Sequence, residues 1–154
     1  MNNHRDTLAV SPLNLPAHTS ISDIFKHFAH KPWAMLLDSA DSNRQDGRFD
    51  IIVADPIATI TTTGKISKIR HSRSNGIQDS SEDPLSLVTA LLKQYMPSQQ
   101  ILLSDDSTLP FLAGALGYFG YDCDLYEENI VFKAQDDLQI PDCLFGFYDC
   151  VITI

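Results

Sequence analysis

The residues best suited to hold a small ligand lie between positions 33 and 56. An apolar run over 33–37 leads into Asp38 and Ser39, and after a polar loop the chain returns through Arg48 and Phe49 into a second apolar run. A carboxylate, a hydroxyl, a cation and an aromatic ring therefore gather where one expected strand ends and the next begins. A few convergent polar groups over an apolar floor are typical of pockets for a small zwitterion with an aromatic side chain. An ordinary strand–loop–strand unit with a capping serine explains the same residues, and on spacing alone both interpretations stay open.

A second candidate is the glycine run Gly114, Gly117 and Gly120, which lies inside an apolar stretch. Its spacing matches neither the dinucleotide-binding fingerprint nor the P-loop, and no Lys or Arg lies within twelve residues of the run. Glycines inside apolar stretches more often mark close backbone packing or a bulge. We therefore predict close packing here and no phosphate site.

An acidic stretch has the composition of a cation-binding or acid–base cluster; it contains Asp122, Asp124, Glu127 and Glu128. The ligand spacing and central glycine of an EF-hand loop are missing. Paired carboxylates act as acid and base only where they converge on a cleft. We interpret these residues as a solvated acidic rim.

Histidine and cysteine suggest no metal or nucleophilic site. The pair His27-x-x-His30 falls on a predicted helix rich in Phe and Ile, and we interpret it as a surface pair. Cys123, Cys143 and Cys150 are an odd number without CxxC spacing, and Cys123 has no clear base partner. Reduced packing thiols explain them, which is typical of a cytoplasmic protein.

The elements that would position the pocket follow from hydrophobic spacing. Apolar residues at i, i+3, i+4 and i+7 predict a helix over 21–28, capped by Ser20 or Ser22 and closed by Pro32. Short apolar runs predict strands over 33–37 and 49–54. Alternation over 57–63, a tight turn and a further run over 66–70 predict a meander.

The second half of the chain contains one strong helix signal. Asp83 followed by Pro84 predicts a helix start, and residues 74–83 before it form a polar stretch. Helically spaced apolar residues then follow up to Pro97; they are Leu85, Val88, Leu91, Leu92 and Tyr95. Residues 144–154 predict one strong strand that stops in mid-pattern. An apolar strand edge that no charge, proline or bulge protects invites aggregation. We therefore expect that this chain is a fragment whose continuation is missing.

Charge and length limit the function classes. The 154 residues carry a net charge of −9, with nine basic and seven acidic side chains in residues 1–73 but two basic and thirteen acidic in 74–154, a net of −11. Such an acidic chain lacks the clustered Lys and Arg that nucleic-acid binding needs. No apolar run is long enough for a signal peptide or a membrane span. Asp outnumbers Glu by 17 to 3, which favours a loop-rich sheet protein.

Several stretches, in order along nearly the whole chain, resemble the anthranilate synthase component I family. Residues 36–40, LLDSA, resemble its LLES-type element, and the strings PWAMLLDS (32–39) and RFDIIVADP (48–56) are most similar to the aminodeoxychorismate synthase branch of that family. The match continues through residues 83–85, 109–111 with 114–122, and 138–142 with 146–149.

The resemblance implies an α+β fold: a mostly antiparallel sheet with helices packed on one face, forming the N-terminal portion of the family's layered sandwich. Residues 1–154 would be one N-terminal domain fragment, which packs on a C-terminal chorismate-binding domain that is absent here. The family branch amidates chorismate at C4, in p-aminobenzoate and folate biosynthesis. It uses Mg²⁺ on the substrate and ammonia released from glutamine by an amidotransferase subunit. The parent would be a cytoplasmic transferase, and the fragment alone would be inactive.

The resemblance also assigns a tryptophan-type pocket to this part of the family. The matching positions are Ser39 and the stretch Asp46, Gly47, Arg48 and Phe49, with Asp38 where the family element has Glu. No catalytic or metal-binding residue can be carried over, because those residues lie in the absent domain. Two alternatives remain: the regulatory domain of an anthranilate synthase component I, and a free-standing small-molecule-binding module.

Overall fold

The computed structural model describes residues 9–39, 49–74, 76–96, 109–121, 123 and 137–154. The chain forms two compact units, which are treated separately below. The small-sheet unit comprises Met1–Asp55, Tyr95–Gly114 and Tyr148–Ile154. The large-sheet unit comprises Pro56–Gln94 and Ala115–Phe147.

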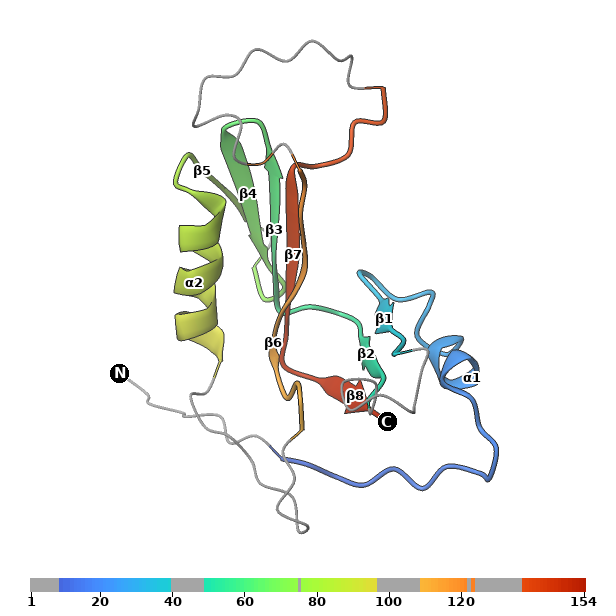
Figure 1. The fold of residues 1–154 in the computed structure, drawn as a ribbon. Coiled ribbons are helices and arrows are strands. Elements are labelled where there is room, and N and C mark those ends of the chain that lie inside the picture. Colours follow the sequence, from blue (N-terminus) through green and yellow to red (C-terminus); the bar gives the residue numbers. More distant parts are fainter. Residues whose placement is uncertain (1–8, 40–48, 75, 97–108, 122, 124–136) are drawn as a thin grey trace. The chain divides into compact units, whose positions relative to one another are not determined.

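The small-sheet unit is built on three very short antiparallel strands. They are β1 (Met35–Leu37), β2 (Ile51–Val53) and β8 (Val151–Thr153), in the order β1-β2-β8 (Figure 1). β2 is the central strand, and its Ile52 and Val53 are each only 1% exposed. The predicted strand over 33–37 is confirmed in its last three residues and the predicted strand over 49–54 in residues 51–53, so both strands are shorter than their apolar runs.

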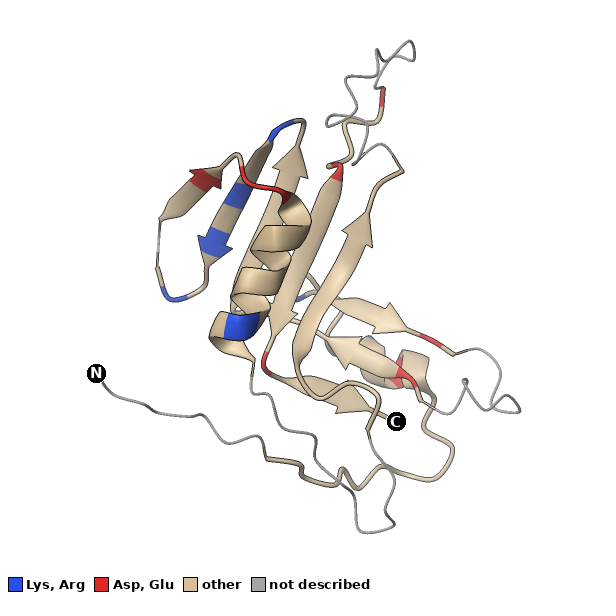
Figure 2. Ribbon diagram, turned by 60° about the vertical axis from the view of Figure 1, so that its left-hand side comes forward, with Lys and Arg blue, Asp and Glu red and all other residues tan. Residues whose placement is uncertain are grey.

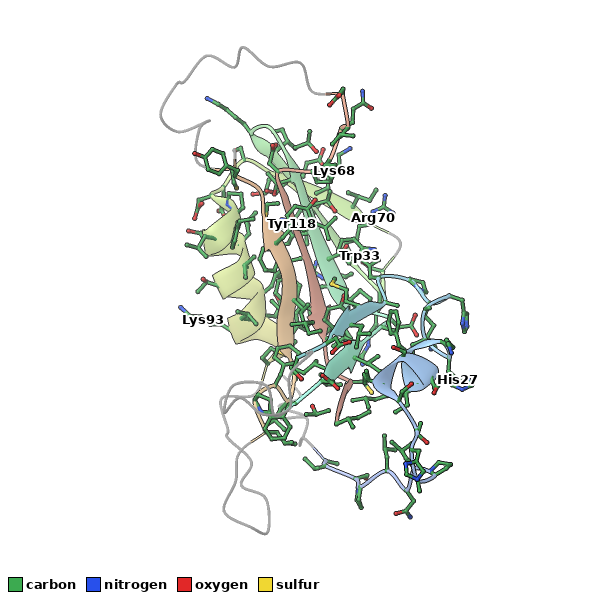
Figure 3. The ribbon with its side chains drawn as sticks, turned by 45° about the vertical axis from the view of Figure 1, so that its right-hand side comes forward. His27, Trp33, Lys68, Arg70, Lys93 and Tyr118 are labelled. Carbon is green, nitrogen blue, oxygen red and sulfur yellow. The ribbon has the colours of Figure 1, made fainter. Side chains whose placement is uncertain are left out.

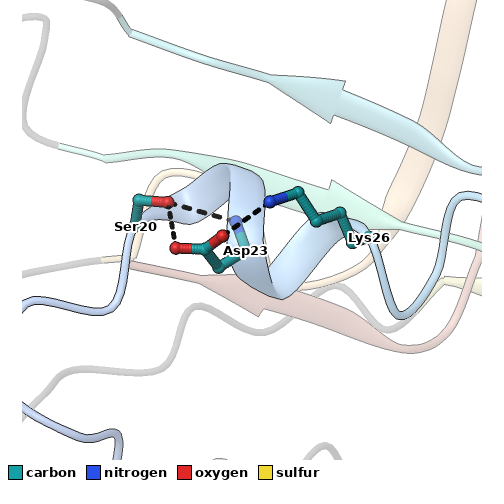
Figure 4. Close-up of polar contacts among 3 residues, drawn as sticks. All are labelled: Ser20, Asp23 and Lys26. Atoms are coloured by element: carbon teal, nitrogen blue, oxygen red, sulfur yellow. Dashed lines mark hydrogen bonds and ion pairs between the residues drawn. The ribbon is translucent and has the colours of Figure 1, made fainter.

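Helix α1 (Ile21–Phe25) begins at a capping serine, as the sequence predicts. The Asp23 main-chain N–H donates to Ser20 Oγ over 3.2 Å, and the Ser20 hydroxyl donates to Asp23 Oδ2 over 2.7 Å (Figure 4). Lys26 Nζ lies 2.7 Å from Asp23 Oδ1. The helix ends three residues before the predicted Phe28. Beyond it the chain continues in single turns, such as the bond from Phe28 N–H to the Phe25 carbonyl, so tight turns replace the last helical turn.

The large-sheet unit contains a five-stranded sheet in the order β5-β4-β3-β7-β6. Its strands are β3 (Ala58–Thr63), β4 (Ile66–His71), β5 (Ile77–Ser80), β6 (Gly114–Phe119) and β7 (Cys143–Tyr148). Helix α2 (Pro84–Tyr95) lies along this sheet (Figures 1 and 2). With two antiparallel sheets and two helices in the described residues, the predicted α+β class is confirmed.

The register assigns each residue of the large sheet to a face. Ile60 lies opposite Ile69 of β4 and Phe145 of β7, and Ala58 lies opposite Phe147. Ile60 and Phe147 are 0% exposed, so this face forms the core of the unit. It is the face covered by α2 (Figure 2), whose Leu87, Val88 and Leu91 are also buried.

The other face of the large sheet carries a different set of side chains. Thr61 lies between Lys68 of β4 and Leu144 of β7, and Arg70 lies one pair further along. Lys68 and Arg70 are exposed and lie on the opposite side of the sheet from Lys93 of α2 (Figure 3). This surface is called the open face below.

Helix α2 starts where the sequence predicts. Asp83 Oδ2 accepts from the Ser86 N–H over 2.8 Å, and this bond lowers the pKa of the Asp83 carboxyl. The buried stripe differs from the prediction, because Leu85 is 58% exposed while Leu87 is buried. At 100° per residue Leu87, Val88 and Leu91 share one face of the helix, and Leu85 falls beyond the edge of that face.

Two strand predictions need correction. Residues 77–80 form β5 and not part of a polar connection, because pairing with β4 stabilises a strand that has no apolar alternation of its own. Residues 144–154 form two strands in two sheets, separated by Asp149 and Cys150, and not one. Asp149 is the one charged residue in 144–154 and apolar residues resume directly after it, so the spacing does not reveal the break.

The predicted close packing of the glycine run is confirmed. A Cβ built on Gly117 would lie 1.9 Å from the Leu144 carbonyl oxygen, and one on Gly120 would lie 2.9 Å from the Asp142 carbonyl oxygen. Gly120 N–H donates to that same Asp142 oxygen over 2.6 Å. The glycines therefore allow the backbone around β6 to approach the β7 backbone closely.

Asp142 joins three parts of the large-sheet unit. Its side-chain Oδ2 accepts from the Gly64 N–H in the β3–β4 turn over 2.6 Å, and its own N–H donates to the Thr62 carbonyl over 2.9 Å. Gly64 has φ of 59°, a conformation that glycine adopts without a steric cost. The turn is thus fixed both by its glycine and by a residue far along the chain.

We predict that Gly117→Ala destabilises the 154-residue chain by about 1–3 kcal/mol, since the backbone must shift to admit the methyl group. The matched control is Gly76→Ala, because a Cβ on Gly76 meets nothing within 4 Å and its effect should stay within about 0.5 kcal/mol. Urea unfolding followed by circular dichroism measures both. Equal midpoints for the two variants would contradict the close approach.

A second prediction concerns the α1 cap. The hydrogen bond from Lys26, followed by the bond from Ser20, lowers the pKa of the Asp23 carboxyl from 3.8 to about 2. A carboxyl with a lowered folded-state pKa stabilises the fold above its unfolded value, so the cap is fully formed above pH 3.8 and is lost as the pH falls through about 2. Carbon-13 NMR of the Asp23 carboxyl should titrate near pH 2. Lys26→Ala should raise that midpoint, and an unchanged midpoint would remove the ion pair as the cause.

Candidate functional site

The candidate pocket residue Ser39 is held by one carboxylate. Ser39 lies two residues after β1, and Asp50 directly precedes β2. Asp50 Oδ1 accepts from the Ser39 N–H over 2.8 Å and from the Ser39 hydroxyl over 2.9 Å. Both residues are partly buried, so the two bonds fix the chain where it leaves the sheet.

Asp50 is in turn fixed by the end of the chain. Its N–H donates to the Ile154 carbonyl over 2.8 Å, and the Ile154 N–H donates back to the Asp50 carbonyl over 3.0 Å. This reciprocal pair extends the β2–β8 ladder by one residue. The position of Ser39 therefore depends on β8 through Asp50.

The other predicted pocket residues are placed only in part. Asp38 is exposed and Phe49 is partly buried, and each makes further interactions within the described chain. Asp46, Gly47 and Arg48 lie outside the described residues. The structure thus brings Ser39 to Asp50, and the predicted convergence of Ser39 with the 46–48 stretch stays a prediction.

A second group of contacts lies at the start of β1. Lys31 Nζ forms an ion pair with Asp55 Oδ2, and the Asp55 N–H donates to the Pro32 carbonyl over 3.0 Å. The Tyr148 hydroxyl donates to the Trp33 carbonyl over 2.9 Å. Tyr148 is 1% exposed, and burial raises its pKa to about 12, so it stays protonated as a donor at neutral pH.

Trp33 and Asp55 both adopt the left-handed backbone region, with φ of 54° and 53°. Such a conformation is uncommon for a bulky residue like Trp33 and costs roughly 1–2 kcal/mol. Asp tolerates it better. Because the ion pair and the two hydrogen bonds hold these two turns, the strain marks a fixed entry into β1 (Figure 3).

Sequence reasoning did not assign a site role to Asp50 or Tyr148. Asp50 lies in the family-like string 48–56 and Tyr148 in 146–149. The sequence does not show that Asp50 bonds to Ser39 or that Tyr148 bonds to Trp33. One available signal was Asp50 itself, an acid at the border of an apolar run. Such a residue needs a donor when the strand end is partly buried.

The remaining candidate residues form no second site within the described chain. No group of three or more His, Cys, Asp and Glu is placed to hold a metal ion there. The acidic residues predicted as a rim, Asp122, Asp124, Glu127 and Glu128, all lie outside the described residues. No helix in the described part is long and apolar enough to cross a membrane.

The cysteines form no disulfide in the described part of the chain, and the predicted packing role is confirmed for Cys143 only, because Cys123 is partly buried and Cys150 is exposed. Cys143 is 0% exposed, and burial raises its pKa to about 11. A buried thiol with a raised pKa is a poor nucleophile. It therefore serves the core of the large-sheet unit.

Comparison with known proteins identifies clear relatives. The chain is 37% identical over 130 residues to aminodeoxychorismate synthase component 1 of Escherichia coli, which covers 84% of this chain and 27% of that protein. It is 34% identical over 148 residues to the Klebsiella aerogenes protein of the same name, covering 96% of this chain and 32% of the relative. Anthranilate synthase component 1 of Acetivibrio thermocellus is 29% identical over 132 residues, covering 84% of this chain and 25% of the relative. No protein-family model matches the chain.

We predict that Tyr148→Phe destabilises the chain by about 1–1.5 kcal/mol, because the buried Trp33 carbonyl loses its donor. Tyr118→Phe is the matched control: its hydroxyl also donates to a carbonyl, that of Pro141, over 3.0 Å, but the side chain is 37% exposed. Water replaces that bond, so the control should change stability by less than about 0.5 kcal/mol. Urea unfolding followed by fluorescence of Trp33, the single tryptophan, reports on both. A larger loss in Tyr118→Phe would be evidence against the role of Tyr148.

Proposed function

This chain is homologous over most of its length to part of aminodeoxychorismate synthase component 1, and we propose that it is the N-terminal, non-catalytic part of a chorismate-amidating enzyme. The observation that carries the proposal is the identity of 34–37% over 84–96% of the chain. The chain spans only about a third of those relatives, 27–32% of their length. Chemistry on chorismate is therefore assigned to the remaining part of the enzyme.

The proposed reaction of the complete enzyme is the amidation of chorismate to 4-amino-4-deoxychorismate, for p-aminobenzoate and folate synthesis. The ammonia would come from glutamine through a separate amidotransferase, which the name component 1 of the relatives supports. Mg²⁺ would bind with the substrate. None of the described carboxylates gathers into a metal site, so the proposal assigns the ion to the catalytic part. A cytoplasmic location belongs to the same proposal.

The open face of the large sheet supports packing against the rest of the enzyme. Thr61 and Leu144 are only partly buried there, and the one described helix of this unit, α2, covers the opposite face. Lys and Arg residues gather on β4 and its flanking turns (Figure 2); they are Lys65, Lys68, Arg70 and Arg73. The partly buried Leu144, beside a hydroxyl and these cations, suits a covered interface with a polar rim.

The second role proposed for this part is to hold tryptophan. Its pocket would use Ser39, Phe49, Asp38 and the stretch Asp46, Gly47 and Arg48. The fixed position of Ser39 on Asp50 supports this role, because a serine held through both its N–H and its hydroxyl is ready to meet a ligand without further ordering. Whether the ligand regulates the enzyme or stabilises it depends on the complete protein.

Anthranilate synthase component 1 is the second candidate. Its representatives share 29–30% identity with the chain over 84% of its length, which is lower than the 34–37% of the first group. The difference favours the aminodeoxychorismate branch. The relatives named above are aminodeoxychorismate and anthranilate synthase components, which does not favour the third alternative, a free-standing binding module.

Growth complementation tests the proposal. The complete gene product that contains this chain should rescue a p-aminobenzoate auxotroph and fail to rescue a tryptophan auxotroph. The 154-residue chain alone should rescue neither, and it should not consume chorismate in the presence of ammonia and Mg²⁺. Rescue of the tryptophan auxotroph would favour anthranilate synthase, and chorismate turnover by the chain alone would refute a non-catalytic part.

A further inference from the structure

A row of cations follows the exposed side of β4. Lys68 and Arg70 alternate with buried residues along the strand, so both belong to the open face of the sheet. Lys65 and Arg73 lie in the turns before and after β4, and all four side chains are exposed (Figure 2). These four residues are called the cation strip below.

The cation strip has no counter-ions in the described chain. The ion pairs of the described residues lie in the small-sheet unit, and neither includes a residue of the strip. Asp79 of β5 lies opposite Lys68 in the register, yet these two described side chains form no ion pair. The strip therefore keeps its positive charge for an anionic partner, although the whole chain carries a net charge of −9.

Exposed aliphatic side chains lie beside the strip. Ile66 of β4 is 44% exposed and shares the alternation of Lys68, and Ile77 of β5 is 50% exposed and lies opposite Arg70. A nucleic acid binds mainly through its phosphates and gains little from aliphatic groups, and the net negative charge of the chain repels a long polyanion. An acidic protein surface neutralises the cations and also covers the isoleucines. The composition of the strip therefore favours a protein partner.

The proposed function supplies two candidate protein surfaces, the rest of the enzyme and the separate amidotransferase subunit. Leu144, the partly buried apolar residue of the open face, lies on β7, two strands and about 10 Å away from β4. By that proposal the rest of the enzyme belongs to the same polypeptide, so its packing on the sheet needs no guidance by long-range charge. A separate subunit must find its site by diffusion, and charges at the rim of an interface raise its association rate. The position and charge of the strip therefore favour the separate subunit.

We propose that the cation strip docks an acidic surface of the amidotransferase subunit, with Ile66 and Ile77 making the apolar contacts. This inference rests on the proposed function and names the face on which its partner subunit binds. The charge of the strip orients and accelerates the encounter, and the two isoleucines are covered once the complex forms.

The association rate of the complete protein with its amidotransferase subunit, measured by biolayer interferometry, tests the docking site. Lys68→Glu should slow association about 3- to 10-fold at about 50 mM salt, and adding Arg70→Glu should bring the loss to about 10- to 100-fold. At about 0.5 M salt the differences should shrink to less than about twofold, because salt screens the charges.

The matched control is Lys93→Glu, which makes the same change in charge at an exposed lysine on the opposite side of the sheet (Figure 3). Its association rate should stay within about twofold of the wild-type rate, since a remote charge is screened. Equal slowing by Lys68→Glu and Lys93→Glu would overturn the inference, because net charge alone would then explain the effect. Unchanged association of the Lys68→Glu, Arg70→Glu protein at low salt would overturn it as well.

Product formation with each nitrogen source separates docking from damage to the enzyme. At limiting amidotransferase, the protein with both Lys68→Glu and Arg70→Glu should lose about tenfold or more of its glutamine-dependent rate, while its rate with added ammonia stays within about twofold of wild type. Equal loss of both rates would assign the strip to the contact with the catalytic part and overturn the docking proposal.

The outcomes also separate the inference from the function beneath it. If the complete wild-type protein forms no 4-amino-4-deoxychorismate from chorismate and ammonia, the proposed function itself is refuted, and the docking proposal falls with it. If that reaction proceeds but the strip variants and the control bind the amidotransferase alike, the proposed function stands and the docking assignment is wrong.

Discussion

Residues 143–153 supply one strand to each sheet, and this long-range pairing is the constraint on which the rest of the structure depends. β7 pairs with β3 and completes the core of the large-sheet unit around Ile60 and Phe147. β8 pairs with β2 in the small-sheet unit. Without β8, β1 and β2 would form a hairpin of three-residue strands, and an isolated two-stranded hairpin is at best marginally stable in water. The proposed ligand site depends on the same pairing, because Asp50 is aligned by Ile154.

The sequence predicts the local features of the fold well. The caps at Ser20 and Asp83, the meander of β3 and β4, and the close packing at Gly117 each follow from residues within one turn or one strand. The missed features are tertiary. β5 exists because β4 offers it a partner, and residues 144–154 divide into two strands because β7 pairs with β3 while β8 pairs with β2. Periodicity in the sequence does not show which partner each strand has.

The candidate site shows the same limit. Ser39 could be identified from its place after an apolar run and from a family resemblance, but its partner could not. Asp38, Asp46 and Asp50 all lie within reach along the sequence, and a side-chain hydrogen bond across a sheet end is decided by register. The pairing of Leu37 with Ile51 directs the chain so that Asp50 meets Ser39, while Asp38 is exposed.

The pairing of β3 with β7 also affects the order in which a growing chain can fold. Thr63, the end of β3, is synthesised well before Cys143, and at about 5–20 residues per second the roughly 80 residues between them take on the order of 4–16 seconds. During that interval the β3–β4 hairpin can form, but its β3 edge is unpaired, and Asp142 is not yet present to hold Gly64. An exposed strand edge of this kind is a site where partly made chains associate. The threonines of β3 make this unpaired edge less apolar than the edge of an all-aliphatic strand.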